Sequence, residues 1–323
     1  THGVAFASPR PKAGPYAPLK VPNGLCALGR DPQSSTEVWS SKFGYPGHPD
    51  YRDFYRDIGF DEEYDYIKPY LHEDGVRRAV GLKYHKITGP QADKEEYDPE
   101  KAAETAKLQA ADFLKKRMAK ADEVYASCGG IKPVLVGAYD AELFGHWWFE
   151  GPQFLEQIIR LIRQERLPLQ MATASEASAS CAADTAESEP ETSSWGEGGY
   201  FEPWANNSND WIYPKINAVA EKMVELANKH KYQDPTPLEK RALTQAARET
   251  LLSQNSDWAF LMYVNSHAGF AQKKILEHCD NFNRLAAMIA EHKVDEAALK
   301  EMETRHNIFP NLNFKVFTSA PVI

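Results

Sequence analysis

The stretch VLVGAYDAELFGHWWFEGP, residues 134–152, decides how this chain is interpreted. Its first part, residues 134–139, is a short apolar run that is typical of a buried strand in a parallel sheet. Asp140 and Glu142 follow where such a strand would pass into a loop. Because α/β barrels carry their chemistry at the carboxyl ends of their strands, the sequence predicts functional side chains at this point.

The side chains that follow the run favour carbohydrate chemistry. Carboxyl groups serve as acid and base at an acetal, and the adjacent indoles of Trp147 and Trp148 are flat surfaces that suit pyranose rings. Asp140 is the strongest catalytic candidate, and its position alone allows it to attack the anomeric carbon or to protonate the leaving oxygen. The alternative for Asp140 is a helix N-cap or a loop carboxylate paired with an arginine.

The roles of Glu142 and His146 stay open at this point. Glu142 either supports the site through buried hydrogen bonds or contacts the substrate directly. His146 either binds a sugar hydroxyl, orients a carboxylate or makes a polar contact in the core. No second His or Cys lies at ligand spacing from His146, so the sequence predicts neither a metal site nor a cofactor.

A second group of aromatic residues lies in a glycine-rich stretch, residues 193–204. Exposed rings on such a loop stack on glucose rings while the backbone lies close to the ligand, so Trp195 and Trp204 are expected to bind substrate. Trp211 directly precedes an apolar helical pattern and is expected to pack instead.

Composition limits the other classes of partner. A net charge of −9 gives no basic surface for nucleic acid, and no apolar run reaches the length of a membrane span. The four cysteines are far apart, which predicts free thiols and a cytoplasmic location; they are Cys26, Cys128, Cys181 and Cys279.

The spacing of apolar residues predicts an α/β part followed by an all-α part. A helix over 99–124, a strand over 133–139 and a helix over 154–162 form a succession that is typical of barrels and doubly wound sheets. Residues 1–100 are expected to form long loops around a few short strands, and 172–194 is a low-complexity stretch that is expected to be an exposed, mobile loop. Helical spacing then covers residues 211–230, 237–254, 256–280 and 281–303.

The stretch from Tyr139 to Pro152 resembles the sequence around the catalytic acid of glycoside hydrolase family 57, and more narrowly of its 1,4-α-glucan branching enzymes. Further motifs recur in the order that the family shows: THG (1–3), ASPRP (7–11), GRD (29–31), VWSS (38–41), YRDIGF (55–60), SSWG (193–196) and SDW (256–258). The resemblance implies the C-terminal part of a (β/α)7 barrel over residues 1–171, the exposed loop 172–194, and an all-α helical domain over 195–323 that contributes to the glucan cleft.

The resemblance also implies roles for particular residues. It makes Asp140 the general acid/base and makes Trp195 and Trp204 aromatic contacts to the glucan. Tyr16 matches a tyrosine on a mobile loop over the cleft. Phe60 stands where some relatives carry a tryptophan, so that glucan contact departs from the family. Substrate contacts are further expected from Glu142, His146 and Trp147.

The implied reaction is retaining cleavage of an α-1,4-glucan and transfer of the chain to a 6-hydroxyl, as in glycogen biosynthesis, without a cofactor or metal. The family's nucleophile is a glutamate in a Trp-Leu-Pro-Glu-Cys-like motif, and its first strand carries a His-x-His-like motif. Neither motif occurs in the 323 residues. The chain is therefore expected to be part of a larger enzyme and inactive by itself. The alternatives are a 4-α-glucanotransferase, an α-amylase, or a non-catalytic α-glucan-binding protein.

Overall fold

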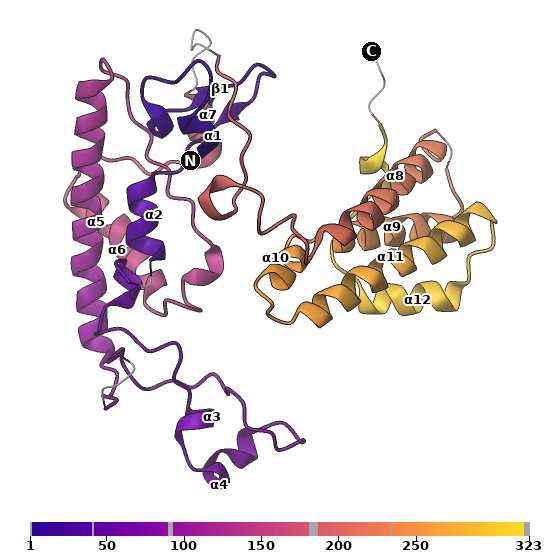
Figure 1. The fold of residues 1–323 in the computed structure, drawn as a ribbon, viewed down its shortest axis with the longest axis horizontal. Helices are drawn as coiled ribbons and strands as arrows, with labels where there is room; N and C mark the ends of the chain where they lie inside the picture. Colours follow the sequence, from indigo (N-terminus) through magenta and orange to yellow (C-terminus); the bar gives the residue numbers. More distant parts are fainter. Residues whose placement is uncertain (1, 41, 90–92, 181–186, 233, 320–323) are drawn as a thin grey trace. The chain divides into compact units, whose positions relative to one another are not determined.

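The chain folds into two units, Thr1–Ser193 and Ser194–Ile323, whose helices and strands are drawn in Figure 1. The computed structural model describes residues 2–40, 42–89, 93–180, 187–232 and 234–319. Each unit has hydrophobic core residues of its own, so each is described separately.

Two helices form the centre of the first unit. The N-cap of helix α5 (Pro99–Ser127) is Asp98, whose side chain accepts hydrogen bonds from the backbone N–H groups of Glu100 and Lys101. Small side chains line its buried face, so α6 (Gly151–Gln164) packs closely against it. The buried apolar residues that the two helices contribute to this core are Ala102, Ala106, Ala110, Leu114, Phe154, Ile158 and Leu161. The helices predicted over 99–124 and 154–162 are confirmed.

Short elements and loops make up the rest of this unit, as the sequence predicts for residues 1–100. Strands β1 (Leu19–Lys20) and β2 (Cys26–Ala27) pair in antiparallel fashion. The α-helices are α1 (His2–Ala5), α2 (Pro32–Trp39), α3 (Ile58–Asp61), α4 (Tyr64–Ile67) and α7 (Ala174–Ala179). Single 3-10 turns are η1 (Gly14–Tyr16), η2 (Tyr45–Gly47), η3 (Lys68–Tyr70) and η4 (Ala141–Leu143).

The strand predicted over 133–139 is wrong. Val136 makes an isolated parallel bridge with Arg30, and its carbonyl accepts a hydrogen bond from the backbone of Asp31 at 2.9 Å. A strand needs a continuing ladder, and the described residues provide only this single step of it. The side chains of Val134 and Leu135 are half-buried rather than buried. Among the described residues the sheet is two-stranded, so they form no closed barrel. Most of their regular structure is α-helical.

Most of the described residues of the stretch 172–194 are exposed, as expected, but the stretch also contains regular structure. Residues 174–179 form α7, which a capping box between Thr173 and Glu176 starts. Farther along, Ser8 and Glu189 exchange backbone hydrogen bonds of 2.9 Å, and Ser188 is buried. These backbone pairings give the segment order that its composition does not reveal. Residues 181–186, with Cys181, lie outside the described residues, and the three other cysteines are free thiols.

The second unit is a bundle of helices (Figure 1). Its elements are η5 (Glu197–Gly199), η6 (Asp210–Ile212), α8 (Tyr213–Lys229), α9 (Pro237–Ser253), α10 (Asp257–Tyr263), α11 (Ala268–Ala290), α12 (Glu296–Arg305) and η7 (Phe314–Phe317). The helices predicted over 211–230 and 237–254 are confirmed. Residues 256–303 form three helices rather than two, because His267 and His292 adopt left-handed backbone angles (φ 57° and 54°) at the breaks.

Helices α9 and α11 form the main contact of this bundle. Their facing side chains are fully buried; they include Leu243, Ala246, Ile275, Phe282 and Leu285. Burial of such apolar side chains is the principal term that stabilises a helical bundle. None of the described helices has the length and apolar character needed to cross a membrane.

The account of this core is testable with two phenylalanines of α11. We predict that Phe282→Ala, at a fully buried position, lowers the free energy of unfolding by about 3–5 kcal/mol, because it leaves a cavity. Phe270→Ala on the same helix is the control, since Phe270 is 51% exposed, and its cost should stay below about 1.5 kcal/mol. Urea unfolding measures both; equal losses would contradict the assignment of the core.

Candidate active site around Asp140

Asp140 is half-buried and lies immediately before the turn η4. Its Oδ2 atom accepts a hydrogen bond from the indole Nε1 of Trp39 at 2.8 Å. Trp39 is 52% exposed, so the pair faces solvent on one side and is accessible to a ligand. Trp39 was not among the predicted site residues, although it lies in the VWSS motif.

Helix α2 places Trp39 beside Asp140. Asp31 caps the start of this helix by accepting hydrogen bonds from the backbone N–H groups of Gln33 and Ser34. The backbone N–H of Asp31 donates to the carbonyl of Val136, in the run that leads to Asp140. The start of α2 is therefore tied to this run, and its last residue, Trp39, bonds to Asp140 directly.

A buried arginine holds α2 against α5. Arg117 on α5 is 5% exposed, and its two terminal nitrogens lie 3.0 Å from Asp31 Oδ2 and 3.0 Å from Glu37 Oε2. These carboxylates belong to the N-cap and the last turn of α2. Because buried charges need opposite charges near them, the three side chains form one unit that fixes the position of α2.

The residues after Asp140 separate into exposed and buried side chains. Gly145 adopts φ +100°, which a side chain would disfavour, and its N–H donates to the carbonyl of Trp148 at 2.8 Å. In this tight turn Glu142 and His146 are exposed, and the His146 ring meets the edge of Phe54 at 5.3 Å. The exposure of these two residues argues against a role in the core.

The adjacent indoles have different environments. Trp147 is half-buried against the core of the unit, whereas Trp148 is 1% exposed and belongs to that core. Trp148 packs at 4.9 Å from Phe154 and 5.8 Å from Tyr51, measured between ring centroids. The flat sugar-binding surface suggested for this pair of indoles is therefore wrong for Trp148.

Tyr16 and Phe60 occupy different surroundings. The hydroxyl of half-buried Tyr16 donates to Asp31 Oδ1 at 3.4 Å, so Tyr16 joins the charged group that holds α2. Burial and the neighbouring carboxylate of Asp31 raise the pKa of Tyr16 above its usual value near 10.0. Phe60 lies in α3 and is 55% exposed.

Trp195 and Trp204 belong to the second unit. Trp195 is 51% exposed, as expected of a residue that stacks on a sugar. Trp204 is half-buried, its Nε1 donates to Ser194 Oγ at 3.1 Å, and its ring lies 6.1 Å from that of Phe260. Part of the Trp204 surface is thus used in packing. Trp211 packs against the core of the helical unit, as expected.

Glu150 is a buried carboxyl group that the sequence analysis did not single out. It is fully buried, and its Oε1 accepts a hydrogen bond from the backbone of Arg52 at 3.1 Å. Burial raises the pKa of Glu150 above its usual value, and the contacts with Tyr97 and Arg52 oppose this only in part. The turn that carries Asp140 is therefore followed by a buried carboxyl group that retains its proton to higher pH than an exposed glutamate does.

A family model described as "1,4-alpha-glucan branching enzyme, C-terminal" matches residues 215–317. Similar curated proteins include a 1,4-α-glucan branching enzyme of Thermococcus kodakarensis, with 29% identity over 89% of this chain and 40% of the relative. A probable 1,4-α-glucan branching enzyme of Mycobacterium tuberculosis is 32% identical over 84% of this chain and 49% of its own length. The chain thus spans half or less of the length of these curated relatives.

Solved structures agree with this match. An α-amylase of Thermotoga maritima superposes with a TM-score of 0.84 and 40% identity, over 99% of this chain and 60% of the amylase chain. The branching enzyme of Thermococcus kodakarensis, of family GH57, superposes with a TM-score of 0.79 and 28% identity, over 94% of this chain and 52% of that one. The chain belongs to glycoside hydrolase family 57.

A GH57-type branching enzyme of Pyrococcus horikoshii gives a TM-score of 0.78 and 31% identity, over 96% of this chain and 54% of that one. Each of these three structures covers both units of this family 57 chain, because each match includes at least 94% of its residues. The sequence assignment to family 57 is confirmed.

The arginine that holds α2 in this family 57 chain gives a first prediction. Arg117→Met leaves Asp31 and Glu37 without their buried counter-charge and should lower the free energy of unfolding by about 3–5 kcal/mol. Arg160→Met, on α6, is the matched control. The side chain of Arg160 is 56% exposed and pairs with Glu156 at 2.6 Å, so its loss should cost less than about 1 kcal/mol. Chemical denaturation measures the free energy of unfolding of both variants. A small loss of stability in Arg117→Met would contradict the role of Arg117 in holding α2 against α5.

Glu150 gives a second prediction, with a defined dependence on pH. Since its pKa is raised in the folded state, the native protein retains this proton at pH values where the unfolded chain has lost it. The contribution of Glu150 to stability therefore falls as the pH rises from its usual pKa of 4.5 through the folded-state pKa. Glu150→Gln does not titrate and should gain stability relative to the wild type over that range, by about 1.4 kcal/mol for each unit of the shift.

Unfolding free energies of both proteins at pH 4.5 and at neutral pH provide the measurement, because 4.5 is the usual pKa of the group. A difference between the variants that does not change with pH would show that Glu150 ionises normally.

Proposed function

We propose that this chain provides the general acid/base side of a retaining 1,4-α-glucan branching enzyme, with Asp140 as the acid/base. The observation that carries the proposal is the hydrogen bond from Trp39 Nε1 to Asp140 Oδ2, on a carboxyl group that remains partly open to solvent. The similarity to branching enzymes over at least 84% of the chain supports the same assignment.

Asp140 serves the proposed reaction with its two oxygens in different roles. An indole N–H only donates, so Oδ2 is held as an acceptor and Oδ1 is the oxygen that carries the proton. In the first step Asp140 gives this proton to the glycosidic oxygen while a second carboxylate attacks the anomeric carbon. In the second step Asp140 takes the proton of a glucan 6-hydroxyl. The hydroxyl oxygen attacks the anomeric carbon of the glycosyl-enzyme, displaces the second carboxylate and forms the α-1,6 branch.

The second carboxylate is the partner that this proposal requires. The resemblance to family 57 places it in a Trp-Leu-Pro-Glu-Cys-like motif, which the 323 residues do not contain. We therefore propose that a segment outside these residues supplies the nucleophile, and that residues 1–171 form the C-terminal part of its (β/α)7 barrel. Residues 195–323 form the helical domain of the same enzyme, and the free cysteines support a cytoplasmic location.

The proposed substrate is an α-1,4-glucan such as amylose or a glycogen-like polymer. The proposed reaction needs no cofactor. Each unit has side chains that are proposed to contact the glucan. In the first unit they are the exposed Phe60, Glu142 and His146 and the half-buried Tyr16 and Trp147. In the second unit they are the exposed Trp195 and the half-buried Trp204. Exposed aromatic faces such as that of Trp195 suit the apolar faces of glucose rings.

An α-amylase is the second candidate function. It is favoured by one observation, the 40% identity and TM-score of 0.84 with the amylase of Thermotoga maritima. The two activities share the cleavage step and differ in the acceptor, which is a 6-hydroxyl for branching and water for hydrolysis.

The products distinguish these functions. The enzyme that contains this chain and its nucleophile is incubated with amylose, and the products are analysed by debranching and by a reducing-sugar assay. New α-1,6 bonds without a comparable rise in reducing ends support the branching enzyme. Reducing ends without α-1,6 bonds support the amylase. Glycogen binding without either product supports a non-catalytic binding protein and would refute the proposal.

Trp39 gives a prediction for activity in the same enzyme. Trp39→Phe removes a hydrogen bond to a charged oxygen, worth about 1.5–3 kcal/mol, so kcat/KM should fall about ten- to a hundredfold. Trp211→Phe is the control, because Trp211 packs in the helical unit and donates to the Ser208 carbonyl instead. Asp140→Asn should abolish branching. Full activity of Trp39→Phe would show that this hydrogen bond does not serve the reaction.

A further inference from the structure

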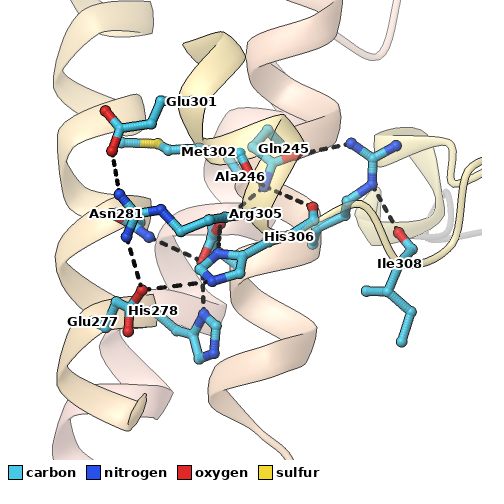
Figure 2. A network of polar contacts seen from close by, with 12 residues as sticks. Gln245, Ala246, Glu277, His278, Asn281, Glu301, Met302, Arg305, His306 and Ile308 are labelled. Atoms are coloured by element: carbon cyan, nitrogen blue, oxygen red, sulfur yellow. Dashed lines mark hydrogen bonds and ion pairs between the residues drawn. The ribbon is translucent and has the colours of Figure 1, made fainter. Parts of the chain in front are cut away.

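The helical unit contains a buried polar cluster made by Glu249, His278 and His306. The residues come from three elements: α9, α11 and the position directly after α12. One potential metal-ligand atom from each residue lies within 4.8 Å of the other two. Glu249 is fully buried, His278 is 3% exposed and His306 is half-buried, and Figure 2 shows the two histidines among the contacts of this network.

The carboxylate of Glu249 lies between the two imidazoles. Its Oε2 is 2.8 Å from His278 Nδ1, and its Oε1 is 2.8 Å from His306 Nδ1. The side-chain amide of Gln245 donates to Oε1 at 2.9 Å, and that of Asn281 donates to Oε2 at 3.4 Å. In the described part of the chain, the ion pairs recorded for Glu249 are both with these imidazoles. The buried negative charge thus depends on what the histidines carry.

His306 also faces a second carboxylate. Its Nδ1 lies against Glu249, and its Nε2 is 3.6 Å from Glu277 Oε1. A neutral imidazole has one N–H group and presents a lone pair on its other nitrogen. With its proton on Nδ1, His306 donates to Glu249 and turns the Nε2 lone pair toward Glu277. With its proton on Nε2, it donates toward Glu277 and turns the Nδ1 lone pair toward Glu249, an arrangement that suits a cation between Nδ1 and the carboxylate.

We propose that Glu249, His278 and His306 bind a divalent metal ion of the zinc class through the Glu249 carboxylate and the two Nδ1 atoms. Two imidazoles and one carboxylate are a ligand set that zinc accepts in proteins. Tetrahedral zinc with bonds of about 2.0–2.2 Å places its ligands roughly 3.4 Å apart. The two 2.8 Å contacts must therefore widen by roughly 0.6 Å, which is within the reach of side-chain rotation.

The surroundings of His306 fit this site. A histidine that coordinates a metal through one nitrogen usually donates its other N–H to a carboxylate, which orients the ring. Glu277 occupies that position, and it is itself held by Lys274 at 2.9 Å and by Arg305 at 3.3 Å. The fourth position of the metal belongs to water or to the second oxygen of Glu249. Binding releases to solvent any proton that the two Nδ1 atoms carry.

The burial of the cluster makes the proposed metal structural. It links α9, α11 and the segment after α12, so it restrains three elements that also meet through apolar packing and through ion pairs such as Arg241–Glu303. This proposal is independent of the proposed enzymatic function. It also departs from the sequence expectation, which found no metal site because it considered only ligands at short spacing.

The test uses the whole chain, freed of metal with EDTA and titrated with ZnCl₂ by calorimetry. We expect one Zn²⁺ per chain with micromolar or tighter affinity, a higher Tm in the presence of zinc, and the visible absorption of a tetrahedral site with Co²⁺. His278→Ala should abolish this binding. His292→Ala is the matched control, because His292 also pairs with a glutamate at 2.8 Å but is exposed, and it should bind zinc as the wild type does.

A second variant covers the case in which His278→Ala does not fold. Glu277→Gln keeps all three ligands and removes the carboxylate behind His306, so zinc affinity should fall about ten- to a hundredfold. The proposal is overturned if the wild-type chain takes up no stoichiometric zinc, or if His278→Ala binds zinc as tightly as the wild type.

Discussion

The ion pairs of Arg117 with Asp31 and Glu37 are the constraint on which the candidate active site depends. Both ends of α2 carry a buried or half-buried carboxylate, and one guanidinium on α5 pairs with both, while Lys116 lies 3.7 Å from Glu37 as well. Taking three charges out of water is costly, so this arrangement is stable only in a narrow geometry. That geometry delivers Trp39 to Asp140. Packing against α6 fixes α5 in turn, because α5 carries both Arg117 and the apolar face that contacts α6.

The acid/base role proposed for Asp140 rests on the asymmetry of its surroundings. Oδ2 is bound by an indole N–H that cannot accept a proton, and in the proposed reaction Oδ1 is the oxygen that exchanges a proton with the substrate. A carboxyl group in this setting can release and regain one proton without turning, which an acid/base catalyst must do twice in each cycle. Glu150, ten residues on, is buried, and burial raises its pKa above the usual value.

The sequence predicted what is local and missed what is distant. The helical spacing of apolar residues in α5 and the motif around Asp140 could both be recognised from neighbouring residues in the sequence. Trp39 is 101 residues from Asp140, and only the folded chain brings them together. The run 134–139 has the composition of a strand, but strand formation depends on partners that the run does not encode. The cluster around Glu249 was missed for the same reason, because its histidines lie 29 and 57 residues away.

The central claim is that Asp140 is the acid/base, and chemical rescue tests it most directly. Asp140→Ala is prepared in the enzyme that includes the nucleophile and is given an α-glycosyl fluoride, whose leaving group needs no proton, together with azide. The account predicts that azide restores turnover and yields a glycosyl azide of retained α configuration, because the covalent intermediate still forms. An inverted β-glycosyl azide would show that Asp140 is instead the nucleophile, and no rescue would show that it does not act as the acid/base.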